Sequence, residues 1–347
     1  MKEKQIINTT TNRAGHKYVR RLVWKALLFT LPFWAVIVLY LHDDPFMVEH
    51  RYAVYDSDVT LNEHHVGWSI YCNRRDSLPF NSFILGNSCT MAFPCDEWEK
   101  YLERDARAVR LFGNGEGLNA ILLKLQALER DKAEIRNVLM ILDHTSLAKT
   151  RQSSGSGHIL PAEISGCSSV GVQLEFLQAF VMPDFLFPYL RYKVTGTILP
   201  SIKHLNPYGR VRNSANNDAI NPRERMIERE GEGYWTNRQQ EFPVRDGNAV
   251  VSDRAVFQSQ FALLHDMADI LNRNHSRVRI LISPDYNQKV LHPKDKEILC
   301  KLFGEENVFD FTGINEYTSD YHYYYEQGHY RPLLGKKLME RIYGYPL

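Results

Sequence analysis

The sequence predicts an α/β fold: a three-layer parallel sheet flanked by helices, flavodoxin-like in kind, with an insertion and one preceding transmembrane helix. Two observations lead to this prediction. Short apolar runs alternate with segments of helical spacing before residue 150 and again after residue 250, and a long uncharged run lies near the N-terminus. Strands that alternate with helices favour a parallel sheet covered by helices.

The uncharged run covers residues 26–41, and residues 21–25 extend it. The total of about 20 residues is the length that a bilayer core requires. Basic residues precede the run and acidic ones follow it: Lys17, Arg20, Arg21 and Lys25 before, and Asp43 and Asp44 after. The positive-inside rule therefore predicts a cytoplasmic segment 1–21, a transmembrane helix 22–41, and a periplasmic or extracellular remainder. A cleaved signal peptide and a buried core helix are the alternatives.

Residues 42–80 are polar and mixed, and they are expected to connect the membrane helix to one domain that covers residues 81–347. Within this domain, short apolar runs predict the strands, at 83–85, 108–112, 137–143, 279–283 and 308–311. Residues 150–250 interrupt the alternation and are interpreted as an insertion. Its aromatic residues and arginines predict that it borders the substrate site.

Composition excludes some functions. The chain has 42 basic and 41 acidic residues, a balance that gives no reason to expect a nucleic-acid partner. Its five cysteines show no C-x-x-C spacing, so a zinc site is not expected, while one disulfide remains possible. No cofactor or other metal is implied. The pair His64–His65 has no partner at ligand spacing and is expected on the solvated surface.

Polar residues follow the predicted strands at their carboxyl ends, where open α/β sheets form their sites. Ser88 follows the first strand, and His329 follows the last one, with Glu326 three residues before it. This combination suits acyl chemistry, because a serine nucleophile needs a base and a group that orients the base. Oxyanion or substrate contacts are expected from the Ser88 amide and from a set of residues at the other strand ends: Asn114, Gly115, Gly117 and Asp143.

Three segments resemble the SGNH (GDSL-like) hydrolase superfamily, in particular its membrane-anchored branch of alginate O-acetyltransferase-like proteins. The matching segments are F-I-L-G-N-S-C-T, L-F-G-N-G-E-G and E-Q-G-H-Y-R-P-x-x-G. The resemblance covers about residues 80–150 and 250–347. Three positions depart from the superfamily pattern: Asn87 and Glu326 replace aspartates, and Asp143 stands where the third block offers an asparagine.

The resemblance implies acyl transfer or ester hydrolysis on O-acyl groups of an envelope or exported polysaccharide. Ser88 would form an acyl-enzyme, which a sugar hydroxyl or water would resolve. The implied partners are the polysaccharide or acylated glycan, the membrane, and a multi-spanning acyltransferase that supplies the acyl group. The alternative is a catalytically silent SGNH-like domain that binds glycan or scaffolds a membrane assembly.

Overall fold

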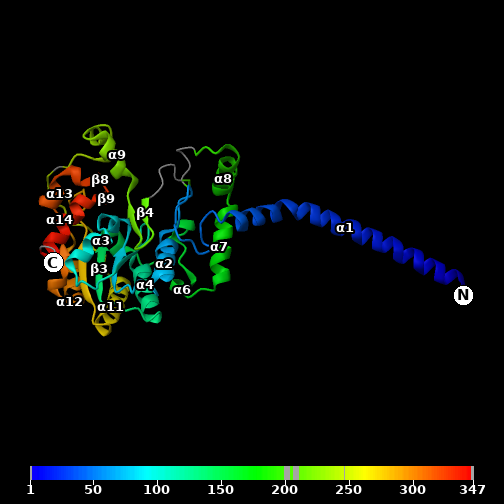
Figure 1. The fold of residues 1–347 in the computed structure, drawn as a ribbon, viewed down its shortest axis with the longest axis horizontal. Coiled ribbons are helices and arrows are strands. Elements are labelled where there is room, and N and C mark those ends of the chain that lie inside the picture. The colour runs from blue at the N-terminus through cyan, green and yellow to red at the C-terminus, as the bar shows by residue number, and fades with distance from the viewer. Residues whose placement is uncertain (1, 199–203, 206–210, 246, 345–347) are drawn as a thin grey trace.

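A parallel sheet forms the centre of the computed structural model, which describes all residues except 1, 199–203, 206–210, 246 and 345–347 (Figure 1). The sheet has five strands in the order β2-β1-β3-β6-β7, and all neighbouring strands are parallel. The strands are β1 Ser82–Gly86, β2 Ala108–Phe112, β3 Asn137–Leu142, β6 Arg277–Ile282 and β7 Val308–Asp310. This is one of the two common orders of doubly wound α/β sheets. The predicted α/β class is therefore confirmed.

Strands β1, β2 and β3 are buried along their whole length, which explains their largely apolar sequences. Helices cover both faces of the sheet. One face packs against α2 (Glu63–Arg74), α4 (Leu118–Arg130), α11 (Gln258–Arg273) and α12 (Pro293–Phe303). The other face packs against α3 (Cys95–Trp98), the 3₁₀ helix η1 (Ser88–Ala92) and α14 (Pro332–Tyr343). The sheet is thus the middle of three layers.

Helix α2 lies within the segment that was expected to be a connector, but it belongs to the core of the domain. Trp68 and Tyr71 of this helix are buried against the sheet, and the Asn62 side chain caps its N-terminus. The expectation of solvated histidines is wrong for His64, which is 1 % exposed and lies against Gly113. Burial holds the pKa of His64 well below its usual value, and that of His65 at about 4.

The insertion divides into two parts on different sides of the body. Helices α6 (Ala162–Ser165), α7 (Ser169–Val181) and α8 (Pro183–Thr195) form the part next to the end of α1 (Figure 1). A hairpin, β4 (Val211–Asn213) with β5 (Asp218–Ile220), leads into the second part, α9 (Pro222–Glu230) and α10 (Gly233–Thr236). Some of the predicted insertion, residues 199–203, 206–210 and 246, lies outside the described residues.

Most of the aromatic residues in the first part of the insertion fill a core. Four of them are buried together with residues near the end of α1: Phe176, Phe180, Phe185 and Tyr189, with Tyr40 and Phe46. These rings pack against one another and not along a substrate site, so the prediction that the aromatic residues of the insertion border that site is wrong for these four. Phe187 is different, since its side chain is 66 % exposed.

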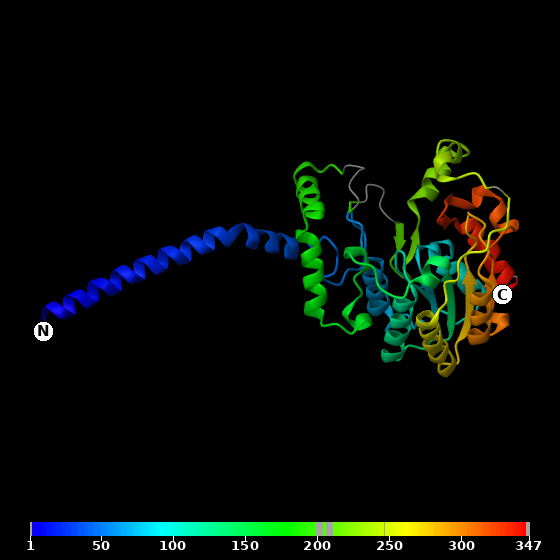
Figure 2. The same ribbon diagram turned by 180° about the vertical axis from the view of Figure 1, so that it is seen from behind.

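Helix α1 (Lys2–Asp43) extends far from the body as a single rod (Figures 1 and 2). Its part Lys17–Asp43, 27 residues, is long and apolar enough to cross a membrane. The remaining helices and strands are short. They are α5 His144–Ala148, α13 Glu316–Ser319, β8 Tyr324–Glu326, β9 His329–Tyr330, and the 3₁₀ helices η2 Glu99–Tyr101, η3 Ser156–His158, η4 Gln239–Glu241, η5 Glu305–Asn307 and η6 Tyr321–Tyr323.

Candidate active site

Ser88, His329 and Glu326 lie together at the carboxyl edge of the sheet. Ser88 begins η1 directly after β1, and its Oγ lies 2.6 Å from Nε2 of His329. Nδ1 of His329 is hydrogen-bonded to Oε1 of Glu326. Serine, imidazole and carboxylate therefore form one continuous chain of hydrogen bonds, although 241 positions separate Ser88 from His329.

The β8–β9 hairpin positions the acid and the base. The two strands are antiparallel, with Glu326 paired with His329 across the turn. The second carboxylate oxygen of Glu326 accepts a hydrogen bond of 2.7 Å from the Gly328 amide inside this turn. Burial alone would raise the pKa of Glu326, but the hydrogen bonds from His329 and Gly328 outweigh it and hold that pKa below its usual value. Glu326 is thus a carboxylate at neutral pH and can stabilise a protonated imidazole.

The turn before Ser88 depends on a glycine. Gly86 has φ +137°, and a Cβ at this position would lie 2.3 Å from the carbonyl oxygen of Ile141. Asn87 then caps η1, because its side-chain oxygen accepts a hydrogen bond of 2.9 Å from the Cys89 amide. These constraints leave Ser88 half-buried at the start of η1, with its hydroxyl directed at His329.

Asp143 lies beside Asn87, at the end of the neighbouring strand β3. One of its oxygens accepts from the Ser146 amide at 2.7 Å and caps α5, and the other accepts from the Asn87 side chain at 2.5 Å. Asp143 therefore acts as a cap and as an anchor for the residue before Ser88. The predicted contact of Asp143 with an oxyanion or substrate stays a prediction.

The glycine loop after β2 is tied to the end of β1. The Gly113 amide donates a hydrogen bond of 3.3 Å to the Gly86 carbonyl. The buried carboxylate of Glu116, within the loop, forms an ion pair of 2.7 Å with Lys124 of α4. Burial raises the pKa of Glu116 to about 7, an effect that the Lys124 charge opposes. This pair fixes the loop from its inner side.

The predicted oxyanion residues of this loop differ in their surroundings. The Gly115 carbonyl accepts from Lys149 Nζ at 2.5 Å, and Gly117 precedes α4 where a Cβ would clash with Lys149. Asn114, which lies between Gly113 and Gly115 in the chain, is half-buried. The structure therefore places the loop next to the strand that leads to Ser88, and the oxyanion role of Asn114, Gly115 and Gly117 stays a prediction.

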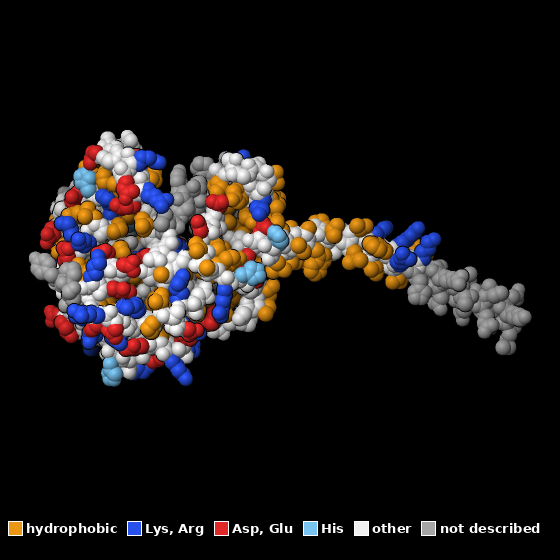
Figure 3. Space-filling model, in the orientation of Figure 1, with side chains coloured by type: hydrophobic (Ala, Val, Ile, Leu, Met, Phe, Trp, Pro, Cys, Tyr) orange, Lys and Arg blue, Asp and Glu red, His pale blue; other side chains and the backbone are white. Residues whose placement is uncertain are grey.

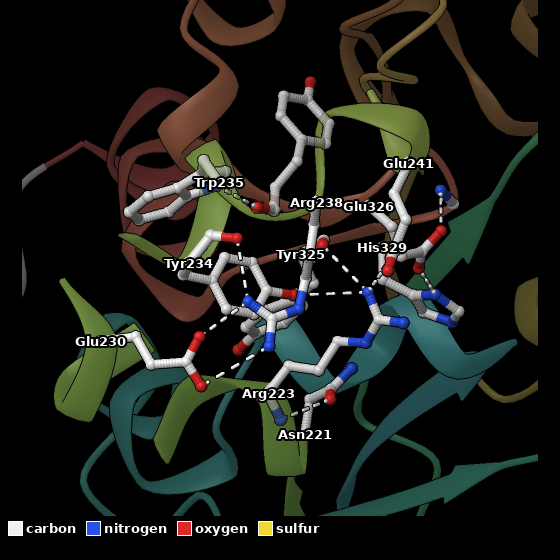
Figure 4. A network of polar contacts seen from close by, with 12 residues as sticks. Asn221, Arg223, Glu230, Tyr234, Trp235, Arg238, Glu241, Tyr325, Glu326 and His329 are labelled. Carbon is white, nitrogen blue, oxygen red and sulfur yellow. Dashed lines mark hydrogen bonds and ion pairs between the residues drawn. The ribbon is translucent and has the colours of Figure 1, made fainter. Parts of the chain in front are cut away.

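The second part of the insertion supports the β8–β9 hairpin, a role that the sequence did not reveal (Figure 4). Arg223 of α9 donates to the Tyr325 carbonyl at 3.1 Å, and the Tyr234 hydroxyl donates to the same oxygen at 2.7 Å. Trp235 Nε1 donates to the Tyr324 carbonyl at 3.0 Å. These three side chains thus satisfy the backbone of β8 immediately before Glu326. Their only sequence signal was the aromatic and arginine content of the insertion.

A second group of contacts joins α9 to both strands of the hairpin. Glu224 accepts from the Arg331 guanidinium at 2.6 Å and from the Tyr325 hydroxyl at 2.5 Å. Arg331 directly follows β9, so Glu224 connects the end of one strand to the middle of the other. A two-stranded hairpin is marginal by itself in water, and these contacts explain how this one stays formed.

Helix α14 fixes η1 from the other side. A Cβ on Gly335 would lie 1.9 Å from the Ala92 carbonyl oxygen, so the backbones of α14 and η1 are in direct contact. Gly335 is the final glycine of the segment E-Q-G-H-Y-R-P-x-x-G. A glycine is required at this position of the segment, because α14 closely approaches η1, the helix that begins with Ser88.

Asp285, after β6, is a further carboxyl group at this edge of the sheet. Burial, and then the nearby charge of Asp143, raise the pKa of Asp285 to about 7. Two residues earlier, the Ser283 hydroxyl lies 3.2 Å from the hydroxyl of Tyr330, the residue after His329. Asp285 lies two positions after the predicted strand 279–283, but nothing in the sequence indicates its raised pKa.

Comparisons with known proteins assign neither a family nor a function to this chain. No protein-family model matches the chain, and no curated protein matches its sequence. Functional inference therefore depends on the arrangement of Ser88, His329 and Glu326 and on the residues around them.

Proposed function

We propose that this chain is an SGNH-type serine acyltransferase or esterase that acts on O-acyl groups of an envelope or exported polysaccharide. The observation that carries the proposal is the hydrogen-bonded chain from Ser88 Oγ through His329 to Glu326, with 2.6 Å between Oγ and Nε2. A base within this distance of a serine hydroxyl can accept its proton as the oxygen attacks a carbonyl.

The reaction has two balanced steps. Ser88 Oγ bonds to the acyl carbon while its proton passes to His329 Nε2, and the same proton then moves to the oxygen of the departing alcohol. In the second step a sugar hydroxyl or water gives its proton to His329 Nε2 and attacks the acyl carbon, and that proton then passes to Ser88 Oγ as the bond from Oγ to the acyl carbon breaks. Glu326 holds the imidazole with its Nδ1 proton toward the carboxylate and stabilises the charged form in both steps.

A polysaccharide substrate is supported by the membrane helix and by the predicted orientation. Acyl groups for a reaction outside the cytoplasm have to be delivered across the bilayer, and a multi-spanning acyltransferase would be the donor partner. The acceptor is then a hydroxyl-rich polymer outside the cell membrane. Resemblance to membrane-anchored O-acetyltransferase-like proteins supports the same assignment.

The activity test uses the purified full-length protein with an O-acetylated polysaccharide and a deacetylated acceptor oligosaccharide. Free acetate indicates hydrolysis, and acetylated acceptor indicates transfer; both should vanish in Ser88→Ala. Either product formed equally well by Ser88→Ala would contradict the proposal.

The orientation that we propose has the N-terminus in the cytoplasm and the domain in the periplasm or outside the cell. It is supported by Lys17, Arg20, Arg21 and Lys25 on one side of the apolar run and by Asp43 and Asp44 on the other. A C-terminal alkaline phosphatase fusion should be active. A C-terminal fluorescent protein that matures only in the cytoplasm should be dark, and the opposite pattern would exclude an exported enzyme.

One observation favours a second candidate, a silent SGNH-like domain that binds glycan. Both side-chain oxygens of Asp143 accept hydrogen bonds, so this residue does not offer the N–H donor that the superfamily's third block supplies. A silent domain would retain glycan binding after Ser88→Ala and would show no ester turnover at any substrate concentration.

A further inference from the structure

Helices α7 and α8 each expose a stripe of apolar side chains in addition to the stripe that they bury. Along both helices the exposed and half-buried members recur at intervals of three and four positions, which places them on one face of each helix. They are Val170, Leu174, Leu177 and Val181 on α7, and Phe187, Leu190 and Val194 on α8. Leu174 is 58 % exposed and Phe187 is 66 % exposed.

The core of this part forms without the exposed members of the stripe, although the half-buried Leu177 and Val181 also pack against it. The inner faces of the two helices already form a closed core through Phe176, Phe180, Phe185 and Tyr189. Apolar side chains gathered on one exposed face indicate a surface that another apolar phase covers.

The position of α1 identifies that phase. The Tyr40 hydroxyl lies 3.5 Å from Gln173 of α7, and Asp43 accepts from Tyr189 at 2.8 Å and pairs with Lys193 at 3.1 Å. The C-terminal end of the membrane-spanning candidate is therefore held directly against α7 and α8. Figure 3 shows hydrophobic side chains along the edge of the body from which α1 leaves, continuous with those of α1.

The geometry of the pair suits the surface of a bilayer and not its interior. Each helix has 13 residues, which corresponds to about 20 Å and is shorter than a hydrocarbon core of about 30 Å. The two helices meet at an angle of 71° and cannot act as one straight span. Arg191 is exposed beside the stripe of α8, where its stem can lie along apolar surface and its charge can reach lipid headgroups.

We propose that α7 and α8 form a second membrane-binding surface, which lies in the headgroup–acyl boundary of the leaflet from which α1 emerges. This inference rests on the membrane anchoring proposed for α1 but not on the acyl chemistry. Docking at two places fixes the tilt of the domain on the bilayer. The β8–β9 hairpin lies on the opposite side of the body (Figures 1 and 2), so a docked domain presents its site away from the lipid surface, toward a polymer.

The test measures the lipid exposure of nitroxide labels on the full-length protein in nanodiscs of phosphatidylcholine and phosphatidylglycerol. Labels are placed at Leu174→Cys and Phe187→Cys in a Cys167→Ser background, since Cys167 is the exposed native cysteine. Leu333→Cys is the matched control, because Leu333 is 49 % exposed on α14, away from α1. Oxygen concentrates in the bilayer and a nickel chelate stays in water, so their collision rates report the surroundings of each label.

The ratio of oxygen to nickel collisions should be several-fold higher at positions 174 and 187 than at position 333, with similar values at the first two. Equal ratios at all three positions would overturn the proposal. Labels at 174 and 187 shielded from both reagents would indicate a protein cover, which also overturns it. Ester turnover of the same samples is measured separately, so a failure of docking and a failure of the proposed chemistry are distinguishable.

Discussion

At the scale of the residue, Ser88 depends on neighbours that fix its direction. Asn87 holds the first turn of η1 through the Cys89 amide and is itself held by Asp143. His329 is oriented from its other nitrogen by Glu326. Glu326 is held in turn by the Gly328 amide, which lies between it and His329 in the chain.

Substitutions in the triad should differ in effect according to role. Ser88→Ala and His329→Ala should each lower ester turnover by about 10⁴-fold or more, because nucleophile and base act as a unit. Glu326→Gln should cost less than either, since it removes orientation and charge but keeps the base. Steady-state rates on one chromogenic ester measure all three. Unequal losses for Ser88→Ala and His329→Ala would contradict the shared role, provided that the melting temperatures match the wild type.

Asp285 should make stability depend on pH. Its pKa of about 7 in the folded state lies above its unfolded value, so its proton favours the folded state at low pH and this contribution is lost as pH rises toward 7. Asp285→Asn should therefore stabilise the protein at pH 8 by about 1–3 kcal/mol and much less at pH 4. Thermal melts in detergent at the two pH values measure the difference. The same gain at both values would show that the pKa of Asp285 does not differ between the folded and unfolded states.

At the scale of the element, η1 and the β8–β9 hairpin are too short to hold a geometry alone. Helix α14 supports η1 through the backbone contact at Gly335, and α9 and α10 support the hairpin through Arg223 and Tyr234. The triad is therefore assembled by packing between elements that are distant in sequence.

Gly335→Ala tests the contact between α14 and η1. A methyl group 1.9 Å from the Ala92 carbonyl oxygen has to displace one backbone or the other. We expect a loss of about 1–3 kcal/mol of stability and a lower turnover from a displaced Ser88. Gly157→Ala is the control, since a Cβ there meets no atom within 4 Å. Equal melting temperatures and equal turnover rates for Gly335→Ala and Gly157→Ala would show that the close contact does not exist in solution.

Arg223→Ala tests the support of the hairpin. The substitution removes the donor to the Tyr325 carbonyl and the ion pair with Glu241 (Figure 4). Looser placement of Glu326 and His329 should lower turnover by about 3- to 30-fold. Arg225→Ala is the matched control on the exposed face of the same helix, and it should leave turnover unchanged. Equal rates for the two variants would assign α9 a role unrelated to the site.

At the scale of the whole molecule, local patterns in the sequence predicted the sheet, the long apolar helix and the residues that meet at the site. Buried parallel strands require short apolar runs, and a helix that spans a membrane requires a long uncharged run. Both kinds of run can be recognised directly in the sequence. Helix α2 left a weaker trace, because it mixes buried Trp68 and His64 with polar positions.

Contacts across long separations could not be predicted from local patterns. Trp235 bonds to the Tyr324 carbonyl across 89 positions, and the aromatic residues of α7 and α8 pack on Tyr40 and Phe46. An aromatic residue in an insertion has the same appearance in sequence whether it meets sugar, lipid or another ring. Only the fold distinguishes the buried Phe176 from the exposed Phe187.

The most direct measurement of the central claim is covalent labelling of Ser88 by a fluorophosphonate, which reacts only with a serine that a base activates. Full-length wild-type protein, Ser88→Ala and His329→Ala are treated in parallel, and the modified peptide is identified by mass spectrometry. We expect stoichiometric label on Ser88 in the wild type and none at that position in either variant. An unlabelled Ser88 in folded wild-type protein would contradict the proposed enzymatic function and would favour the silent glycan-binding domain.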